Sequence, residues 1–202
     1  MDGIGYKINP MKTAELLKLT YNGKGSIPFH QRILDALTPM GTRGLTMINL
    51  GAGDAKMTKG YPFKRRYLVD CQPRDTSPKD LIQADCLQFM RLLTEKVDVI
   101  YALDFIEHLT KDDGLEILRL IEDKADVGII FTPLGDLCVG QTAGPDGHHS
   151  GWLPEEFQSR NWNTLTCPSF HSPWFDGQTH GAFYAWFGIN PNLLLQTLRG
   201  ET

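Results

Sequence analysis

The chain has 202 residues, which is enough for one domain with a full hydrophobic core. Its 41% hydrophobic and 22% charged residues are typical of a soluble globular protein. The formal net charge of −4 at pH 7 argues against a protein that coats nucleic acid without regard to sequence.

The expected location follows from the N-terminus, the most apolar stretch and the cysteines. The first ten residues, MDGIGYKINP, lack the apolar run of a secretory signal. The stretch Val97–Ile106 contains two aspartates and is too short to span a bilayer. The four cysteines are scattered without C-x-x-C spacing, as reduced thiols are (Cys71, Cys86, Cys138 and Cys167). We therefore expect a cytoplasmic protein without membrane association.

Two helices are expected before the first strand. Met11–Tyr21 has a helical pattern, and Pro28–Leu37 is a second helix with proline near its start. We assign residues 1–44 to an N-terminal helical segment and residues 45–202 to the core of what is one globular domain overall.

From residue 45 onward, strands and helices alternate. The apolar runs expected to be strands are Leu45–Leu50, Tyr67–Asp70, Leu81–Asp85, Val97–Leu103 and Val127–Thr132. The expected helices are Ala55–Gly60, Cys86–Leu93 and Lys111–Asp123, the last with an apolar stripe at Leu115, Leu118 and Ile121. This alternation predicts a parallel sheet covered by helices on both faces.

The last third of the chain has a different pattern. A short helix is expected at Pro154–Ser159, followed by strands at Asn163–Cys167 and Ala182–Phe187. No good helix separates these two strands, so they should pair antiparallel. We therefore expect an α/β fold in one domain, with a mostly parallel seven-stranded sheet that ends in a C-terminal antiparallel hairpin.

A glycine turn follows the first strand, at Gly51, Ala52 and Gly53. Glycine lets the backbone turn sharply and approach a ligand closely, and such turns present ligands at the carboxyl ends of strands. A dinucleotide fingerprint needs a third glycine where this chain has Lys56, and the G-K-[ST] of a P-loop is missing. The turn therefore favours a ligand without phosphates.

Two acidic residues end the next two strands. Asp70 ends the second strand, where a carboxylate can accept hydrogen bonds from both hydroxyls of a ribose. Asp85 ends the third strand, where a carboxylate followed by a free backbone N–H could bind the amine and ring nitrogen of an adenine. Each acid taken alone is more often a helix cap or a solvated loop residue. Their order on successive strands favours a nucleoside ligand.

These segments, in their order along the chain, resemble the motifs of class I S-adenosylmethionine-dependent methyltransferases. The matching stretches are INLGAGDA, YLVDCQ, ADCLQF, VDVIYALDFIEHL and FTPLG, and the resemblance runs from about Leu45 to Phe187. It implies a Rossmann-like fold with a terminal antiparallel hairpin, and S-adenosyl-L-methionine as the cofactor.

The resemblance also assigns residues to the cofactor. The turn would line its methionine and ribose, Asp70 would hold the ribose diol, and the end of the fourth strand would lie under the sulfonium. The complete set is Asn49, Gly51, Ala52, Gly53, Asp70, Cys71, Asp85, Cys86, Leu103 and Asp104. Asn49 stands where the family usually has an acid, and an asparagine can still orient the loop by hydrogen bonds.

The acceptor side is expected at two further motifs. After the fourth strand there is neither N/D-P-P-Y nor Pro-Cys, which disfavours methylation of base amino groups or of cytosine carbon 5. Asp104, Glu107 and His108 are spaced so that one helical turn would place them on one side. His148 and His149 belong to a later loop that, in this family, covers the methyl end of the cofactor.

Two resemblances compete for the acceptor. EHL and H-x-S-G-W-x-x-E-E-F resemble small-molecule and glycan O-methyltransferases, many of them metal-free, which makes His108, His148 and His149 catalytic candidates. Asp104, Glu107, His108 and His148 also resemble the metal site of small-RNA 3′-terminal ribose methyltransferases, where the ion grips two hydroxyls. That family's nucleic-acid modules are absent and the chain is acidic. We therefore favour a small-molecule or glycan acceptor and no metal over a nucleic acid.

Two blander alternatives stay open. Glu107 and His108 could merely cap or orient the helix that begins at Thr110. The chain could also be a catalytically degenerate partner subunit that binds the cofactor without turnover, for which Asn49 and the short acceptor region are the support.

Overall fold

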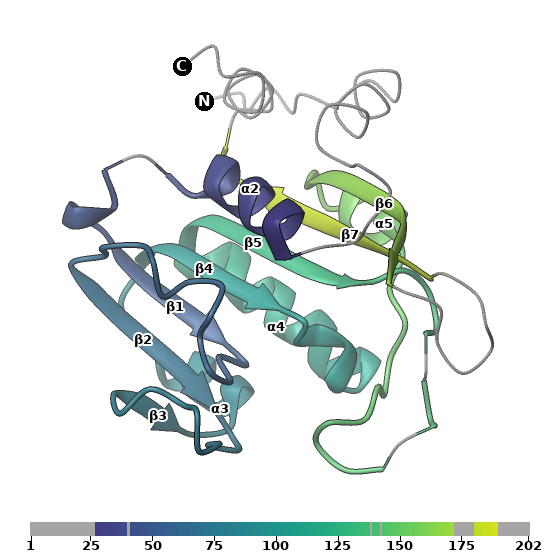
Figure 1. The fold of residues 1–202 in the computed structure, drawn as a ribbon, viewed down its shortest axis with the longest axis horizontal. Coiled ribbons are helices and arrows are strands. Elements are labelled where there is room, and N and C mark those ends of the chain that lie inside the picture. Colours follow the sequence, from purple (N-terminus) through teal and green to yellow (C-terminus); the bar gives the residue numbers. More distant parts are fainter. Residues whose placement is uncertain (1–26, 40, 138, 142, 172–179, 190–202) are drawn as a thin grey trace.

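The computed structural model describes residues 27–39, 41–137, 139–141, 143–171 and 180–189. These residues form a seven-stranded sheet with the order β3-β2-β1-β4-β5-β7-β6 (Figure 1). The strands are β1 (Thr46–Leu50), β2 (Arg65–Asp70), β3 (Leu81–Gln83), β4 (Val97–Leu103), β5 (Ala125–Pro133), β6 (Asn163–His171) and β7 (His180–Phe187). The predicted mostly parallel sheet with a C-terminal antiparallel hairpin is confirmed.

The first strand lies inside the sheet, as its apolar sequence requires. Residues 47–50 are all buried, and β1 pairs in parallel with β2 on one side and β4 on the other. The order of the strands along the chain therefore reverses between β1 and β4. In open α/β sheets, ligands bind outside the carboxyl ends of the strands at such a reversal, so the segments after β1, β2 and β4 are positioned to form a site.

The C-terminal hairpin closes the other side of the sheet. β7 pairs antiparallel with β5 and with β6, and its residues 181–186 are all buried. The aromatic content of β7 suits this inner position, because large side chains can pack on both faces of the strand.

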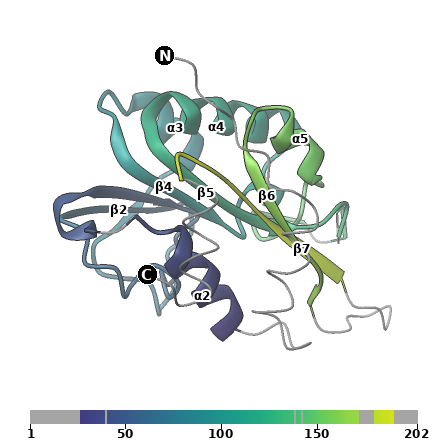
Figure 2. The same ribbon diagram turned by 90° about the horizontal axis from the view of Figure 1, so that it is seen from above.

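Helices lie on both faces of the sheet (Figure 2). α2 (Ile27–Leu37) covers one face, where Ile33 and Leu34 join a core that includes Tyr101. α3 (Cys86–Leu92), α4 (Lys111–Lys124) and α5 (Pro154–Gln158) cover the opposite face. In α4, Leu118 and Ile121 are buried as predicted, Ile117 completes the stripe, and Leu115 is only partly buried.

Three sequence predictions of local structure are wrong. Ala55–Gly60 is a series of turns and not a helix, and Ala55 has a φ of 54°, a left-handed conformation that cannot continue a right-handed helix. The third strand stops at Gln83, before Asp85, because the Asp85 side chain caps α3. The single helical turn expected from Asp104 to His108 is instead a 3-10 turn, η2 (Ile106–His108), that begins two residues after Asp104.

The helix predicted at Met11–Tyr21 lies outside the described residues, and the helix predicted at Pro28–Leu37 is α2. The division of the chain at residues 44 and 45 stays a prediction. Among the described residues, no helix has both the length and the apolar character that crossing a membrane requires.

Candidate cofactor and acceptor site

The glycine turn after β1 is shaped by both of its glycines. Gly51 and Gly53 have φ angles of 64° and 52°, in the left-handed region that favours glycine. A Cβ at Gly51 would lie 2.5 Å from Cδ2 of Phe105, whereas a Cβ at Gly53 would meet nothing within 4 Å. Gly51 therefore allows the turn to pack against the segment after β4. Gly53 borders open space, as a ligand-binding turn should.

Asp70 is held directly beside this turn. Its Oδ2 accepts a hydrogen bond of 2.8 Å from the Gly53 backbone N–H, and its Oδ1 accepts one of 2.8 Å from Gln72 N–H. The carboxylate is half-buried at the end of β2, so its position relative to the turn is fixed while lone pairs stay available. The next residue, Cys71, is exposed, and partial burial together with the Asp70 charge raises the pKa of its thiol.

Asp85 and Cys86 have structural partners in this fold. The Asp85 side chain accepts a 2.8 Å hydrogen bond from Gln88 N–H and so caps α3, as the blander alternative expected. Cys86 is buried, its Sγ lies 3.6 Å from the Val69 carbonyl oxygen, and burial raises its pKa to about 12. Their contact with an adenine stays a prediction.

Asn49 of β1 is hydrogen-bonded to the loop that follows this strand. Its side chain is buried, and its Nδ2 donates to Thr58 Oγ1 at 3.1 Å. Thr58 Oγ1 in turn donates to the Ala55 carbonyl oxygen at 3.4 Å. An asparagine can donate in this way and an ionised acid cannot. The asparagine therefore helps to close the loop after β1.

The end of β4 leads into a strained residue. After Leu103 the chain turns at Asp104, whose φ of 49° is unusual for a residue other than glycine. The Asp104 N–H donates to the Phe131 carbonyl oxygen at 2.9 Å, which fixes the turn against β5. Such conformations are costly and cluster at functional sites.

Glu107 is a buried carboxyl that is hydrogen-bonded to a neutral hydroxyl. It is 3% exposed, and its Oε2 accepts a 2.9 Å hydrogen bond from the Thr132 hydroxyl. Burial, and then the charge of Asp104, raises the pKa of Glu107 to about 8. Surrounding protein also raises the pKa of Asp104, to about 6, although solvent reaches the Asp104 side chain. The pKa of Glu107 is raised the further of the two, because Glu107 is buried whereas the Asp104 side chain is reached by solvent.

The two half-buried histidines are each anchored through one ring nitrogen. His108 Nδ1 lies 3.1 Å from the Gly147 carbonyl oxygen, and His148 Nδ1 lies 2.6 Å from that of Leu137. A carbonyl oxygen only accepts, so we assign the proton of each neutral ring to Nδ1, which leaves Nε2 with a lone pair. Burial lowers the pKa of His108 and so favours this neutral form.

Glu107, His108 and His148 converge. Each offers one ligand atom, and these atoms lie within 4.8 Å of one another. Three of the four residues predicted for a metal are thus brought together, while Asp104 stands outside the group. His149 also stands outside it, since its ring is exposed with Nε2 3.0 Å from the Gly144 carbonyl oxygen. A catalytic role for His149 stays a prediction.

Sequence reasoning missed the residues that support this cluster. Thr132, Ser150 and Trp152 are all buried and hydrogen-bonded to Glu107 or to the neighbouring carbonyl of Ile106. The signal for the last two was present in the H-x-S-G-W pattern, which places them a fixed distance after His148. No sequence motif distinguished Thr132 from its neighbours in the apolar strand.

No protein-family model and no curated protein matches the sequence. Solved structures with a similar fold include the small RNA methyltransferase HEN1, at 18% identity and a TM-score of 0.50, over 80% of this chain and 26% of that one. TehB from Haemophilus influenzae is 11% identical, with a TM-score of 0.54, over 86% of this chain and 66% of that one. Magnesium protoporphyrin IX methyltransferase from Synechocystis PCC 6803, solved with bound SAH, is 12% identical, with a TM-score of 0.52, over 88% and 93%.

This chain therefore spans about a quarter of the length of HEN1, of which it covers 26%. Sequence identities this low support only a similarity of fold. Together with the strand order and the antiparallel hairpin, they show that the chain has the class I methyltransferase fold.

Proposed function

We propose that the chain is an S-adenosylmethionine-dependent methyltransferase that methylates an oxygen atom of its acceptor. The observation that carries the proposal is the position of Asp70, whose carboxylate is held against the glycine turn by Gly53 N–H at 2.8 Å. The solved structure of the same fold with bound SAH supports the choice of cofactor.

The residues at the turn fit this cofactor. A Cβ at Gly53 would meet no atom within 4 Å, so space is open beside the Asp70 carboxylate. The carboxylate is fixed by two backbone N–H groups and keeps lone pairs for ribose hydroxyls. When bound, the cofactor would supply a methyl group on a sulfonium, which is a good leaving group. The task left to the protein is to position the acceptor oxygen and receive its proton.

The acceptor side offers two ways to receive that proton. In the metal-free version, which the sequence favoured, His108, His148 or His149 accepts it. The His108 and His148 rings are anchored with Nδ1 toward a backbone carbonyl, so Nε2 of each is left to accept a proton. The small-molecule or glycan acceptor belongs to this version.

The second candidate is a metal-assisted reaction, and the convergence of Glu107, His108 and His148 favours it. Metal-ligating histidines typically donate their other ring N–H to a carbonyl, and both of these rings have Nδ1 within hydrogen-bonding distance of one. Mixed oxygen and imidazole ligands suit manganese, iron, cobalt or zinc better than calcium. Such a site would lower the pKa of an acceptor hydroxyl and suit an acceptor with two adjacent hydroxyls, such as a terminal ribose.

Binding and turnover test the proposal in sequence. We expect calorimetry to show binding of S-adenosylhomocysteine, and we expect methyl transfer to a member of an acceptor panel of phenols, glycans and short RNAs. NADH binding more tightly than S-adenosylhomocysteine would contradict the proposal. Binding without turnover on any acceptor would favour the partner-subunit alternative.

A further inference from the structure

We propose that Ser150 and Trp152 are positioning residues that set the arrangement of His148 relative to Glu107 and His108. The proposal rests on the proposed function, because these three side chains form its acceptor side. Its direct basis is the way in which residues 149–152 hold the η2 turn.

The contacts involve two successive carbonyl groups of η2. The Glu107 carbonyl oxygen accepts hydrogen bonds from the backbone N–H groups of His149 at 2.7 Å and Ser150 at 3.1 Å. The Ile106 carbonyl oxygen accepts from Ser150 Oγ and from Trp152 Nε1, both at 3.3 Å. Trp152 Nε1 also donates to Ser150 Oγ at 3.0 Å. All of these donors come from the segment that directly follows His148.

This arrangement matters because η2 is only three residues long. So short a 3-10 turn has little stability of its own, and its orientation must come from its partners. The segment that holds the turn begins next to His148, so the same hydrogen bonds that orient Glu107 and His108 also fix where His148 stands. The two imidazole rings accordingly meet with their centres 5.0 Å apart.

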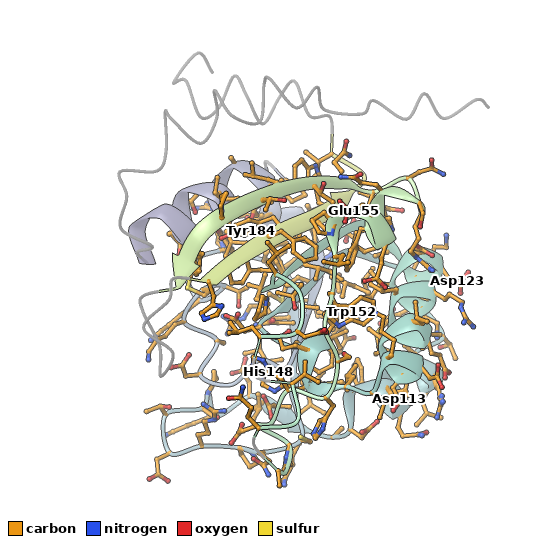
Figure 3. The ribbon with its side chains drawn as sticks, turned by 90° about the vertical axis from the view of Figure 1, so that its right-hand side faces the viewer. Asp113, Asp123, His148, Trp152, Glu155 and Tyr184 are labelled. Carbon is orange, nitrogen blue, oxygen red and sulfur yellow. The ribbon has the colours of Figure 1, made fainter. Side chains whose placement is uncertain are left out.

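The Trp152 ring is tightly enclosed by its neighbours. It is fully buried beside α4, in the region between this helix and the loop that carries His148 (Figure 3). A Cβ at Gly114 of α4 would overlap the ring, so glycine makes the room. Lys111 Nζ stands 3.5 Å from the ring centroid and donates to the Gly151 carbonyl oxygen at 2.7 Å.

Packing alone does not explain the polar contacts. A buried phenyl ring could fill much of the same space without a donor, and an alanine could replace Ser150 without creating a large cavity. Instead, two buried polar groups link to each other and to the Ile106 carbonyl. Fully satisfied buried networks of this kind specify one arrangement of the elements they join.

The experiment compares Ser150→Ala and Trp152→Phe with the matched control Ser159→Ala. Ser159 also donates its hydroxyl to a backbone carbonyl, that of Glu156, but it is exposed and caps the C-terminal end of α5. The first readout is the NMR nuclear Overhauser effect between the rings of His108 and His148 in the metal-free full chain. The second is the affinity and absorption spectrum of bound Co²⁺.

We expect both variants to weaken the ring-to-ring effect and to lower cobalt affinity by about tenfold, the lower end for loss of a ligand's supporting partner. The control should leave both readouts as in the wild type, and Ser150→Thr, which restores the hydroxyl, should recover the ring-to-ring effect. S-adenosylhomocysteine affinity should be unchanged in all of them.

The outcomes separate this proposal from the proposed function. If Ser150→Ala and Trp152→Phe only lower the melting temperature and keep the ring-to-ring effect, the two residues serve packing and the positioning role is wrong. If the wild type binds no cobalt but the variants lose the effect, positioning holds and the metal-assisted version fails. If the wild type binds no S-adenosylhomocysteine, the proposed function fails whatever the rings show.

Discussion

The imidazole rings of His108 and His148 lie 5.0 Å apart at an interplanar angle of 77°, although they come from different loops of the chain. Each ring turns Nδ1 toward a carbonyl of the protein, Gly147 for His108 and Leu137 for His148. The other ring nitrogens are therefore left to bind a proton or a metal ion, and the buried Glu107 carboxyl is close enough to bind the same ion. In the metal-free version a histidine would accept the proton of the acceptor, whereas in the metal-assisted version both rings of this pair would bind the ion.

The first prediction concerns the cofactor. Asp70→Ala removes a carboxylate placed to accept ribose hydroxyls, and hydrogen bonds to a charged group contribute about 1.5–3 kcal/mol. S-adenosylhomocysteine should therefore bind at least about tenfold more weakly in calorimetry. Asp75→Ala, which removes an exposed acid from the segment after β2, is the control and should bind as the wild type does. Wild-type affinity in a folded Asp70→Ala variant would remove Asp70 from the site.

The second prediction compares two neighbouring histidines. If the metal-assisted version is correct, His148→Ala should lower manganese or cobalt affinity by about tenfold or more and reduce turnover in parallel. His149→Ala should do neither, because the His149 ring is exposed and turned to Gly144. Elemental analysis and chelator titration of the wild type supply the measurement.

A protein that is active without an ion would support the metal-free version. If the protein contains no ion and chelator leaves turnover intact, the metal-assisted version is wrong. Turnover should then rise with pH as the catalytic histidine loses its proton. Burial lowers the pKa of His108, so a His108 base should reach full activity at a lower pH than an ordinary histidine would.

The third prediction concerns pH and stability in the metal-free protein. The folded-state pKa of Glu107 is about 8 and its ordinary value is 4.5, so the folded state binds the proton more tightly. The stability associated with this proton is complete below pH 4.5 and is lost as pH rises toward 8, by an amount on the order of a few kcal/mol. Melting temperatures measured from pH 5 to 8 should fall more steeply in the wild type than in Glu107→Gln.

The control for this prediction is Glu155→Gln, which removes an exposed carboxyl and should leave the wild-type profile unchanged. Asp104→Asn should reduce the decline, because the Asp104 charge is one cause of the raised pKa of Glu107. Identical slopes in the wild type and Glu107→Gln would show that Glu107 is ionised in the folded protein.

The fourth prediction concerns the glycine between Ser150 and Trp152. A Cβ at Gly151 would overlap the Asp136 side chain and lie 2.8 Å from the Gly135 carbonyl oxygen. Gly151→Ala should therefore lower the free energy of unfolding by about 1–3 kcal/mol, as overpacking does. Urea denaturation is the measurement, with Gly44→Ala as the control, since a Cβ there would meet nothing within 4 Å. Equal loss in both variants would mean that the strain lies elsewhere.

The sequence alone was sufficient for most of the sheet. Strands such as Val97–Leu103, and the pairing of the last two strands, could be predicted because apolar runs and their separation are local properties of the chain. The helix predicted at Ala55–Gly60 was wrong because a stretch this short has too little helical preference of its own to resist loop contacts. Here such contacts include the hydrogen bond from Asn49 to Thr58.

The candidate site could likewise be predicted only in part. The sequence by itself determined which side chains could do chemistry, since the glycine turn, the acids after the strands and the histidine-bearing loop are visible as residue types in order. It could not tell which of the adjacent residues His148 and His149 would lie against His108, because the two have the same chemistry. Only the tertiary structure decided this, because it places the His148 ring against His108 and leaves the His149 ring exposed beside the Gly144 carbonyl oxygen. The docking of residues 149–152 onto η2 then selects the ring that faces His108.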